Sequence, residues 1–185
     1  MALGTWWNGD PLPKLPALAS FTAQRSTDKQ RIAQLTSLSL QEIEARFQSG
    51  NHIYLAFLDQ TPVAYGWLAN RVGSVDEIQL SFTLPTRNCY LWDFLTFPTW
   101  RGHGIYPHFL QEIIRQEQQS IDRFWILYAP GNDTAAHSIS KAGFLFVGEL
   151  TTTYGHVSGI TLFDASERAF TGAALLNLPV VPHDT

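Results

Sequence analysis

The hydrophobic positions of the chain are organised most clearly between residues 89 and 128. Residues 89–97 form an apolar, aromatic-rich run that stops before Pro98, which is typical of a buried strand. Residues 105–119 repeat their apolar positions with the period of a helix, and residues 123–128 form a second compact apolar run. The apolar face of the helix consists of Ile105, Phe109, Leu110, Ile113 and Ile114. A strand, a loop, a helix and a strand in this order predict a right-handed crossover between two parallel strands.

Shorter predicted elements lie on both sides of this crossover. Asp28 and Ser39 stand where they can cap two short helices. Asn132 or Asp133 can cap a third helix, which ends at Gly143. The predicted helices cover residues 31–35, 41–48 and 133–143. The predicted strands cover residues 52–58, 62–69, 76–84, 144–151 and 157–163, of which the first two form a hairpin. The mixture of both periods predicts an α/β (α+β) fold class.

The chain has 185 residues, a length that suits a single domain. Residues 1–20 are predicted to form an irregular N-terminal arm, because the three prolines between positions 11 and 16 oppose a regular helix or a central strand. We expect residues 21–165 to form the folded domain and residues 166–185 to form a C-terminal tail. Residues 171–185 are interpreted either as a flexible tail or as a strap onto a partner subunit.

Composition limits the compartments and partners that suit the chain. Hydrophobic residues make up 45% of the sequence, which excludes wholesale disorder. Cys89 is the only cysteine, so no intrachain disulfide is expected and a reducing compartment is predicted. We find no secretion signal and no run near the ~20 apolar residues of a membrane span, so we predict a cytoplasmic protein without membrane contact. The net charge of −4, without a basic block, argues against a nucleic acid partner.

The loop that precedes the main helix carries the candidate binding chemistry. Gly102 and Gly104 flank His103 directly before the helix, and glycine lets a ligand approach the backbone closely. The first N–H groups of a helix lack internal partners, and the helix dipole adds about half a positive charge there. Together with the charge of Arg101, these features predict a site for a phosphate or diphosphate. The same glycines are also compatible with a strand-to-helix turn that has only a geometric role.

Two familiar nucleotide-binding motifs do not match the spacing of this loop. A dinucleotide fingerprint requires a glycine or an alanine where Pro107 stands. A P-loop requires Gly-Lys-Ser/Thr, which does not occur in the chain. A nucleotide-binding domain that does not use coenzyme A is therefore disfavoured.

Residues 97–106 resemble the acetyl-CoA loop of the GNAT N-acetyltransferases, whose core pattern is Arg/Gln-x-x-Gly-x-Gly/Ala. Arg101 and Gly104 match this pattern, whereas Tyr106 stands where a small residue is usual. Residues 132–144 are similar to the Asn-x-x-Ala…Lys-x-Gly-Phe helix of the same family. Because the two motifs follow each other in the family's order, joined by the expected helix and strand, the chain is identified as a candidate GNAT N-acetyltransferase.

The resemblance covers residues 28–163 and implies a mixed central β-sheet, flanked by helices, whose two parallel strands splay apart to hold acyl-CoA. The residues that it implies for binding acetyl-CoA are Leu95, Thr96, Phe97, Arg101, Gly102, His103, Gly104, Ile105, Tyr106 and Asn132. The first three would pair through their backbone with the pantetheine arm, and residues 101–106 would hold the diphosphate. Asn132 would touch the pantetheine or fix the loop. Tyr106 is expected either to narrow the diphosphate pocket or to pack beneath the helix.

Attack of an amine on a thioester requires a group that removes a proton, because an ammonium group is not a nucleophile. Asp93 is the only acid in residues 89–97, and strand alternation places it on one face with Leu95 and Phe97. By the resemblance it lies where many relatives carry a glutamate that accepts this proton. We expect its apolar surroundings to bury it and make it a better base. Binding of the substrate ammonium group and a purely structural role are the alternatives. A backbone N–H near Thr96 or Phe97 is expected to polarise the thioester carbonyl.

The proton donor for the leaving thiolate is less clearly indicated. Many relatives place a tyrosine five residues before the last phenylalanine of the second motif, but this chain has Ile139 there. Ser138 is the candidate substitute, with His137 and Tyr128 as alternatives. Protonation by water, and activity that is weak or absent, are the remaining outcomes. No metal is expected, because no pair of histidines has the spacing of a metal site.

The sequence therefore predicts an N-acetyltransferase that transfers an acetyl group from acetyl-CoA, its co-substrate, to a primary amine of a small molecule or peptide by direct attack in a ternary complex. The alternative is a catalytically weak acyl-CoA-binding sensor or interaction module, which Ile139 leaves open. No motif identifies the acceptor: Trp6, Trp7, Trp67 and Trp92 are candidate lining residues, although core packing is the commoner use of tryptophan. A homodimer is expected only by analogy with the fold.

Overall fold

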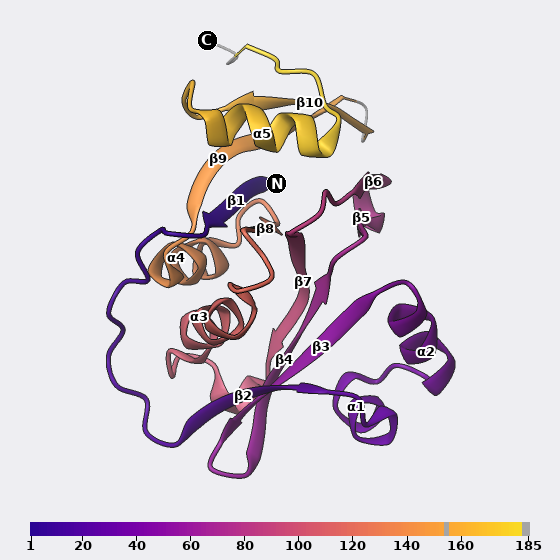
Figure 1. The fold of residues 1–185 in the computed structure, drawn as a ribbon, viewed down its shortest axis with the longest axis vertical. Coiled ribbons are helices and arrows are strands. Elements are labelled where there is room, and N and C mark those ends of the chain that lie inside the picture. Colours follow the sequence, from indigo (N-terminus) through magenta and orange to yellow (C-terminus); the bar gives the residue numbers. More distant parts are fainter. Residues whose placement is uncertain (154–155, 183–185) are drawn as a thin grey trace.

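A computed structural model describes residues 1–153 and 156–182 of the chain. In these residues, eight strands form one sheet in the order β10-β9-β1-β8-β7-β4-β3-β2, and β5 and β6 form a separate pair (Figure 1). The strands are β1 (Ala2–Trp7), β2 (Phe21–Ser26), β3 (Asn51–Leu58), β4 (Thr61–Ala69), β5 (Val72–Val75), β6 (Leu80–Thr83), β7 (Asn88–Thr96), β8 (Arg123–Tyr128), β9 (Leu145–Thr153) and β10 (His156–Leu162). The helices are α1 (Lys29–Thr36), α2 (Leu40–Gln48), α3 (Ile105–Glu117), α4 (Asp133–Ala142) and α5 (Glu167–Leu176).

The large sheet is mixed, because β7 and β8 run parallel whereas the other neighbouring strands run antiparallel. α3 connects the parallel pair, as the sequence predicted. The two strands pair only over residues 88–91 and 123–126, although both continue beyond that point. They therefore separate toward their carboxyl ends. The predicted fold class, a mixed sheet with a splayed parallel pair flanked by helices, is confirmed.

The helices divide between the two faces of the sheet. α3 and α4 cover one face, whereas α1 and α2 pack at the opposite side, over β3 and β4 (Figure 1). α5 lies against β9, β10 and the β5–β6 pair. None of the described helices is both long and apolar enough to span a bilayer.

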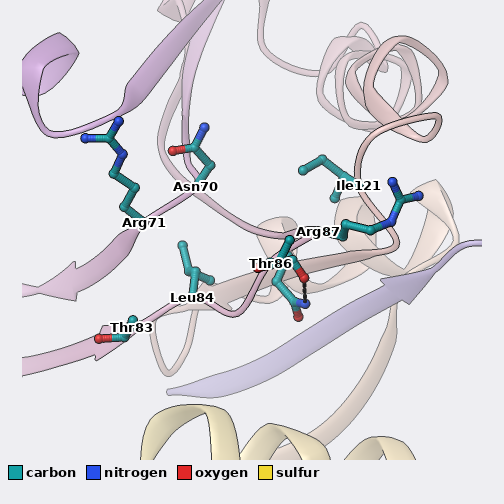
Figure 2. Close-up of a pocket in the computed structure, with 8 residues that line it drawn as sticks. Asn70, Arg71, Thr83, Leu84, Thr86, Arg87 and Ile121 are labelled. Atoms are coloured by element: carbon teal, nitrogen blue, oxygen red, sulfur yellow. Dashed lines mark hydrogen bonds between the residues drawn. The ribbon is translucent and has the colours of Figure 1, made fainter.

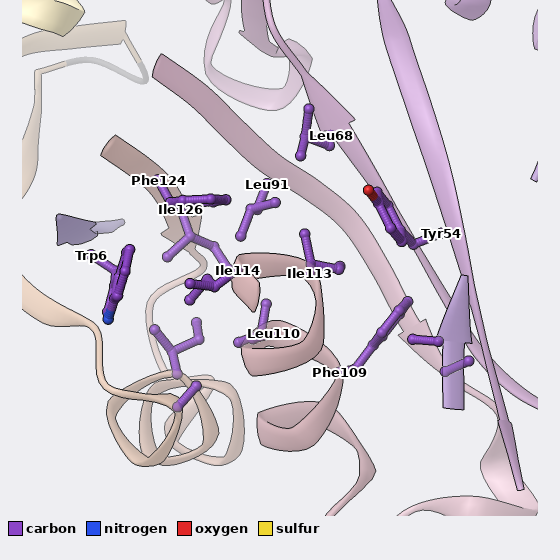
Figure 3. Close-up of a cluster of buried hydrophobic side chains, with 14 of the residues drawn as sticks. Trp6, Tyr54, Leu68, Leu91, Phe109, Leu110, Ile113, Ile114, Phe124 and Ile126 are labelled. Carbon is purple, nitrogen blue, oxygen red and sulfur yellow. The ribbon is translucent and has the colours of Figure 1, made fainter. Parts of the chain in front are cut away.

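The apolar face of α3 belongs to the largest buried cluster among the described residues. Its side chains meet those of β7 and β8 and, from the N-terminal strand, Trp6 (Figure 3). The members that Figure 3 labels are Trp6, Tyr54, Leu68, Leu91, Phe109, Leu110, Ile113, Ile114, Phe124 and Ile126. Full burial of such a side chain stabilises the fold by about 1.5–3 kcal/mol relative to exposure, so this cluster fixes α3 on the sheet.

The N-terminal arm is not irregular throughout, and that part of the prediction for residues 1–20 is wrong. Residues 2–7 form β1, which lies inside the sheet between β8 and β9 and pairs with both. The strand is buried apart from its last residue, Trp7, which is half-buried. The prolines oppose a central strand only where they stand, between positions 11 and 16, and the structure is irregular from Pro11 to Leu18. The six residues before them were free to extend.

The predicted C-terminal tail also contains a regular element. Residues 167–176 form α5, capped by Ser166, whose side chain accepts a hydrogen bond from the Ala169 N–H at 3.2 Å. Leu175 and Leu176 are buried, and the chain then pairs with the edge of β10 through a parallel bridge between Ile160 and Val180. Residues 183–185 of the predicted tail lie outside the described residues.

Two further segments differ from the sequence prediction. The strand predicted over residues 76–84 is a short 3-10 turn, Asp76–Ile78, followed by β6. The edge strand β2 was not predicted, because its alternation is weak: only Ala23 of its residues is buried. The other predicted helices and strands are present within a few residues of their predicted ends.

The capping predictions are confirmed in detail. Asp28 accepts a hydrogen bond from the Arg31 N–H at 3.0 Å at the start of α1. Ser39 and Glu42 form a reciprocal capping box at the start of α2. α4 ends at Gly143, whose φ of 106° belongs to the left-handed region that glycine tolerates.

Residues 8–20 cross the outer side of α3 and α4 before the chain enters β2 (Figure 1). Gln111 of α3 donates to the Pro13 carbonyl at 2.8 Å, and the side chain of Gln111 is buried. His108 lies with its Nε2 2.8 Å from the Pro16 carbonyl. These contacts hold the irregular segment against the helix layer, so that β1 and β2 belong to one folded unit.

We expect Trp6→Ala to lower the free energy of unfolding by about 3–5 kcal/mol, because the side chain is 1% exposed and its removal leaves a cavity under α3. Phe170→Ala is a matched control: Phe170 is an aromatic residue of α5 that is 52% exposed, and its loss should change the free energy by about 0.5 kcal/mol or less. Urea unfolding followed by circular dichroism measures both. Equal small effects in the two variants would show that β1 is not part of the core.

Candidate active site

Where β7 separates from β8, the carboxyl end of β7 has, within the described part of the chain, a neighbouring strand on one side only. Beyond Leu91, the described part of β7 pairs with β4 alone. The Phe97 N–H donates to the Val63 carbonyl at 2.9 Å. Because hydrogen-bonding direction alternates along an antiparallel pair, the N–H and carbonyl of Thr96 face the opposite way, toward β8. Of the two amides predicted to polarise a carbonyl, that of Thr96 therefore faces the opening, whereas that of Phe97 is engaged within the sheet.

A β-bulge shapes β7 at Asp93. The register between β4 and β7 shifts here, so that Gly66 alone faces Asp93 and Phe94. Asp93 has a φ of 50°, in the left-handed region that aspartate enters more readily than most residues. The ring of Phe94 occupies the space above Gly66: a Cβ atom added to Gly66 would lie 2.2 Å from a carbon of that ring. Only glycine fits at position 66 while Phe94 keeps this place.

The side chain of Asp93 forms an ion pair that the sequence did not predict. The Asp93 carboxylate accepts a hydrogen bond from Nη1 of Arg46, on α2, at 2.6 Å. The Arg46 guanidinium in turn lies over the rings of Trp67 and Trp92, with its carbon 4.7 Å and 4.5 Å from their centroids. The Asp93 side chain is 34% exposed, so the expected burial is wrong. The bulge turns the carboxylate outward, where α2 supplies its partner.

The predicted common face of Asp93, Leu95 and Phe97 is confirmed. Leu95 and Phe97 pack against the buried cluster beneath α1 and α2, on the side from which Arg46 reaches Asp93. Phe94 points to the opposite side, against α3. The bulge thus separates a carboxylate side, under α2, from a helix side, under α3.

The glycine loop lies directly after this strand end. Gly102 and Gly104 have φ values of 81° and 73°, and open space surrounds the position of a Cβ atom on each. Gly104 is the N-cap of α3, and no acidic residue stands in the first helical turn. Pro107 has no N–H, which leaves Ile105 and Tyr106 as the amides of the first turn. An exposed helix start of this kind can bind an anion.

The charged and ring side chains of the loop contact the end of β7 and one another. Nε of Arg101 donates to the Thr96 carbonyl at 3.3 Å, which ties the loop to the end of β7. His103 lies with its Nδ1 3.0 Å from the Arg101 carbonyl, and its ring meets Trp100 edge-on with centroids 5.9 Å apart. Arg101 and His103 are exposed, so both side chains are accessible to a ligand on the loop.

Tyr106 packs beneath α3, which resolves the two alternatives that the sequence left open. Its ring lies 5.6 Å from that of Phe94, and Phe109 meets Phe94 at 5.4 Å. Burial raises the pKa of the Tyr106 phenol well above its usual range, so this group is neutral at physiological pH. Ile105 is 2% exposed, and its side chain belongs to the same core. The contribution of both residues to a loop site is therefore through their backbone.

The second motif places its residues at the start and middle of α4. The Asn132 side chain accepts a hydrogen bond from the Ala135 N–H at 3.1 Å and caps the helix. Ile139 is fully buried in the core. Of the predicted proton donors on this helix, Ser138 is half-buried and His137 is exposed.

Tyr128 stands at the carboxyl end of β8, across the opening from β7. Its ring packs against Phe146, with centroids 5.1 Å apart, and the side chain is half-buried. Burial, with the charges of Glu149 and Asp133, raises the pKa of the Tyr128 phenol above its usual value. The phenol therefore keeps its proton at neutral pH and is able to donate it.

Two surface cavities lie away from the glycine loop. One of about 470 Å³ lies at the amino end of β7 and includes Asn88, the first residue of that strand (Figure 2). Its two arginines, Arg71 and Arg87, point in diverging directions, and Arg87 is paired with Asp122 at 2.6 Å. The other, of about 460 Å³, lies beside Trp92. In residues 1–153 and 156–182 no three His, Cys, Asp or Glu side chains gather where they could share a metal ion.

No protein-family profile and no curated protein matches the sequence. Solved structures match its fold. A GCN5-related N-acetyltransferase from Kribbella flavida superimposes on 78% of this chain at 17% identity with a TM-score of 0.52, and the chain spans 53% of that protein's length. An aminoglycoside 6'-N-acetyltransferase from Acinetobacter baumannii matches 72% of this chain and 96% of its own at 18% identity, with a TM-score of 0.53.

A third match is a putative acetyltransferase from Salmonella typhimurium, whose structure contains its cofactor acetyl-CoA. It covers 80% of this chain and 96% of its own length at 13% identity, with a TM-score of 0.52. At such identities the similarity establishes the architecture. The chain has the fold of the GNAT acetyltransferases, as its two sequence motifs predicted.

Proposed function

We propose that the chain is an N-acetyltransferase that transfers the acetyl group of acetyl-CoA to a primary amine of a small molecule or peptide. The observation that carries this proposal is the position of the glycine loop. An exposed helix start with two left-handed glycines follows directly on the strand that has parted from its parallel neighbour. A diphosphate on the loop would leave the pantetheine arm beside the free edge of that strand.

The proposed binding of coenzyme A uses backbone groups more than side chains. The amides of residues 102–106 would hold the diphosphate, with Arg101 and His103 at its rim. The pantetheine arm would pair with the free N–H of Thr96. Leu95 and Phe97, the residues on either side of Thr96, would flank this contact. Asn132 would act by fixing the start of α4, as its capping hydrogen bond suggests. The Salmonella typhimurium acetyltransferase of the same fold, solved with acetyl-CoA, supports this assignment.

In the proposed reaction the acceptor arrives as an ammonium ion and must lose a proton before it attacks. Asp93 would bind the ammonium group and accept that proton, directly or through water, since the carboxylate is partly exposed. The amine nitrogen then bonds to the thioester carbon while the Thr96 N–H stabilises the carbonyl oxygen. The carbon–sulfur bond breaks, the nitrogen gives its second proton to water, and the thiolate takes a proton from a nearby donor to leave as coenzyme A.

Tyr128 is our preferred proton donor for the thiolate. Its phenol lies at the end of β8, beside the opening, and remains protonated at neutral pH. Ser138 of α4 is the other candidate, but a serine hydroxyl is a far weaker acid than a phenol. Ile139 cannot donate a proton and is buried, which supports the alternative function, a catalytically weak acyl-CoA-binding module. The aminoglycoside acetyltransferase of Acinetobacter baumannii has the same fold, which supports the enzymatic function over the binding module.

The proposal is tested by calorimetry with coenzyme A and by thiol release from acetyl-CoA with a panel of primary amines. We expect Gly104→Ala to weaken coenzyme A binding by about tenfold or more, because a left-handed alanine costs about 1–2 kcal/mol and the loop would relax away from the ligand. Gly9→Ala is the matched control, since Gly9 also has a left-handed φ, 98°, with open space around it. Binding of coenzyme A without thiol release would favour the binding module. No binding to the wild type would exclude both functions.

We expect Asp93→Asn to lower kcat by about tenfold or more, because the amide keeps the shape of the carboxylate but accepts no proton at neutral pH. Asn also tolerates the left-handed φ of this position. Asp59→Asn is the control, since Asp59 has a φ of 53° in the turn between β3 and β4. Wild-type turnover in the Asp93→Asn variant would remove this residue from the role of base.

We expect Tyr128→Phe to lower kcat by about tenfold or more and Ser138→Ala to leave it near the wild-type value. Because the pKa of Tyr128 is raised, the loss of its proton should reduce the rate only above about pH 10. Steady-state kinetics from pH 6 to 11 measure both effects, with Tyr90→Phe as the control, because Tyr90 packs against Phe82 in a different buried cluster from Tyr128. The reverse ranking of the two variants would assign the proton to Ser138, and two unaffected variants would assign it to water.

A further inference from the structure

The ion pair between Arg46 and Asp93 lies at the point where the acceptor amine would enter, if the proposed function holds. From this pair we infer the class of acceptor: an amine with a carboxylate one carbon away, as in a free α-amino acid. The ammonium group would meet Asp93 while the carboxylate meets Arg46. The sequence and the matched structures do not specify this acceptor, and it follows from the charges on the α2 side of the bulge.

Arg46 is held in place as a fixed cation. Its guanidinium lies over the faces of Trp67 and Trp92, at 4.7 Å and 4.5 Å from the ring centroids. Arginine keeps its charge at any physiological pH and carries five N–H donors in one plane. To the described residues its side chain makes one hydrogen bond, from Nη1 to the Asp93 carboxylate at 2.6 Å. With 22% of the side chain exposed, the remaining donors can bind an anion that arrives from outside.

Asp93 supplies the matching anion, and it is also accessible. The bulge presents the carboxylate on the same side as Arg46, with 34% of the side chain exposed. Tyr65, the neighbour of Leu95 on β4, stands near: its pKa is raised by burial and by the charge of Asp93. The phenol is neutral, and its ring lies in the buried cluster beneath α1 and α2, 6.3 Å from that of Phe97, so it can donate a hydrogen bond on this side of the sheet. The site therefore contains one fixed cation, one anion and one neutral donor.

These charges suit a zwitterion better than a polyamine. In an α-amino acid the ammonium and carboxylate groups are separated by one carbon, and Arg46 and Asp93 are likewise direct neighbours. A polyamine such as an aminoglycoside would bring several positive charges beside Arg46, which the single Asp93 would not offset. The acids of α2 are already engaged: Glu42 in the capping box and Glu44 with Lys29. An aminoglycoside is thus a poor acceptor for this chain.

A cavity beside Trp92 provides room for the rest of such an acceptor. The cavity of about 460 Å³ begins at Trp92 and is lined by the polar side chains of Ser49, Asn51, Arg71 and Ser74, with Val72. Trp92 is shared by the cavity and by the Arg46 stack, and its Nε1 donates to Asn51 at 3.2 Å. The α-amino and α-carboxylate groups would be bound at Arg46 and Asp93, and the side chain of the amino acid would extend along the indole toward this cavity.

The test compares each of the twenty free amino acids with its α-amide, which keeps the amine and loses the carboxylate. Binding is measured by calorimetry on the full chain with coenzyme A present, and acetyl transfer by thiol release. We expect the best amino acid to bind about tenfold or more tighter than its amide, since a hydrogen bond to a charged group is lost in the amide. An aminoglycoside should bind more weakly than that amino acid.

Arg46→Gln should reduce this preference, measured as the ratio of the affinity for the acid to that for the amide, to about twofold or less, because glutamine offers no cation to the carboxylate. Arg31→Gln is the matched control, because Arg31 of α1 also stacks on an aromatic ring, that of Phe57 at 4.8 Å, on the same side of the sheet. Arg46→Lys, which keeps the charge, should retain part of the preference. If Arg46→Gln fails to fold, the comparison of acid and amide in the wild type still tests whether the site recognises the carboxylate.

Either of two results with the wild type would overturn the inference: equal affinity for acid and amide, or an aminoglycoside as the tightest acceptor. A preference that persists in Arg46→Gln would also overturn it. Because acceptor binding is measured independently of turnover, these results are distinct from failure of the proposed function. That failure would appear as absent thiol release with every amine.

Discussion

The site depends on the end of pairing between β7 and β8 after four residues, and the bulge at Asp93 explains where it ends. The last paired residue is Leu91, and the bulge begins two positions later. A bulge bends its strand and increases the local twist, so β7 turns away from β8 at this point. Gly66 and Phe94 hold the bend, because the ring fills the space that a side chain on Gly66 would need. The opening between the strands is thus built into the packing of β4 against β7.

The same bend gives the two sides of β7 different chemistry. Toward β8 it leaves the Thr96 amide free beside an exposed helix start, which suits a diphosphate and an amide-rich arm. Toward α2 it exposes the Asp93 carboxylate to Arg46 and to whatever approaches from that side. An acyl donor and an amine would therefore meet across one strand. The irregular backbone conformation of Asp93 is associated with this junction, as strained positions often are with sites of function.

The local features of the site could be predicted from the sequence, because they depend on neighbours in the chain. The apolar run, the glycines before a helix and the Asn132 cap each have a signature within a few residues. The Arg46–Asp93 pair joins positions 47 residues apart and leaves no such signature, and the bulge that exposes Asp93 depends on Gly66 of another strand. Despite the bulge, the predicted placement of Asp93 and Leu95 on one face of the strand is correct. α5 was missed although its signals were present: Ser166 as a cap and Asn177 as the left-handed end. β1 is short, and its central position comes from pairing with β8 and β9, which lie more than a hundred residues away in the sequence.

A crystal structure with coenzyme A bound is the most direct test of the central claim, that the parted strands and the loop form one acyl-CoA site. We expect the diphosphate within hydrogen-bonding distance of the amides of residues 102–106 and the pantetheine arm beside the Thr96 N–H. The sulfur should then lie between β7 and β8, on the path from Asp93 to Tyr128. Density for coenzyme A at another surface, such as the cavity at the amino end of β7, with the opening unchanged, would contradict this account.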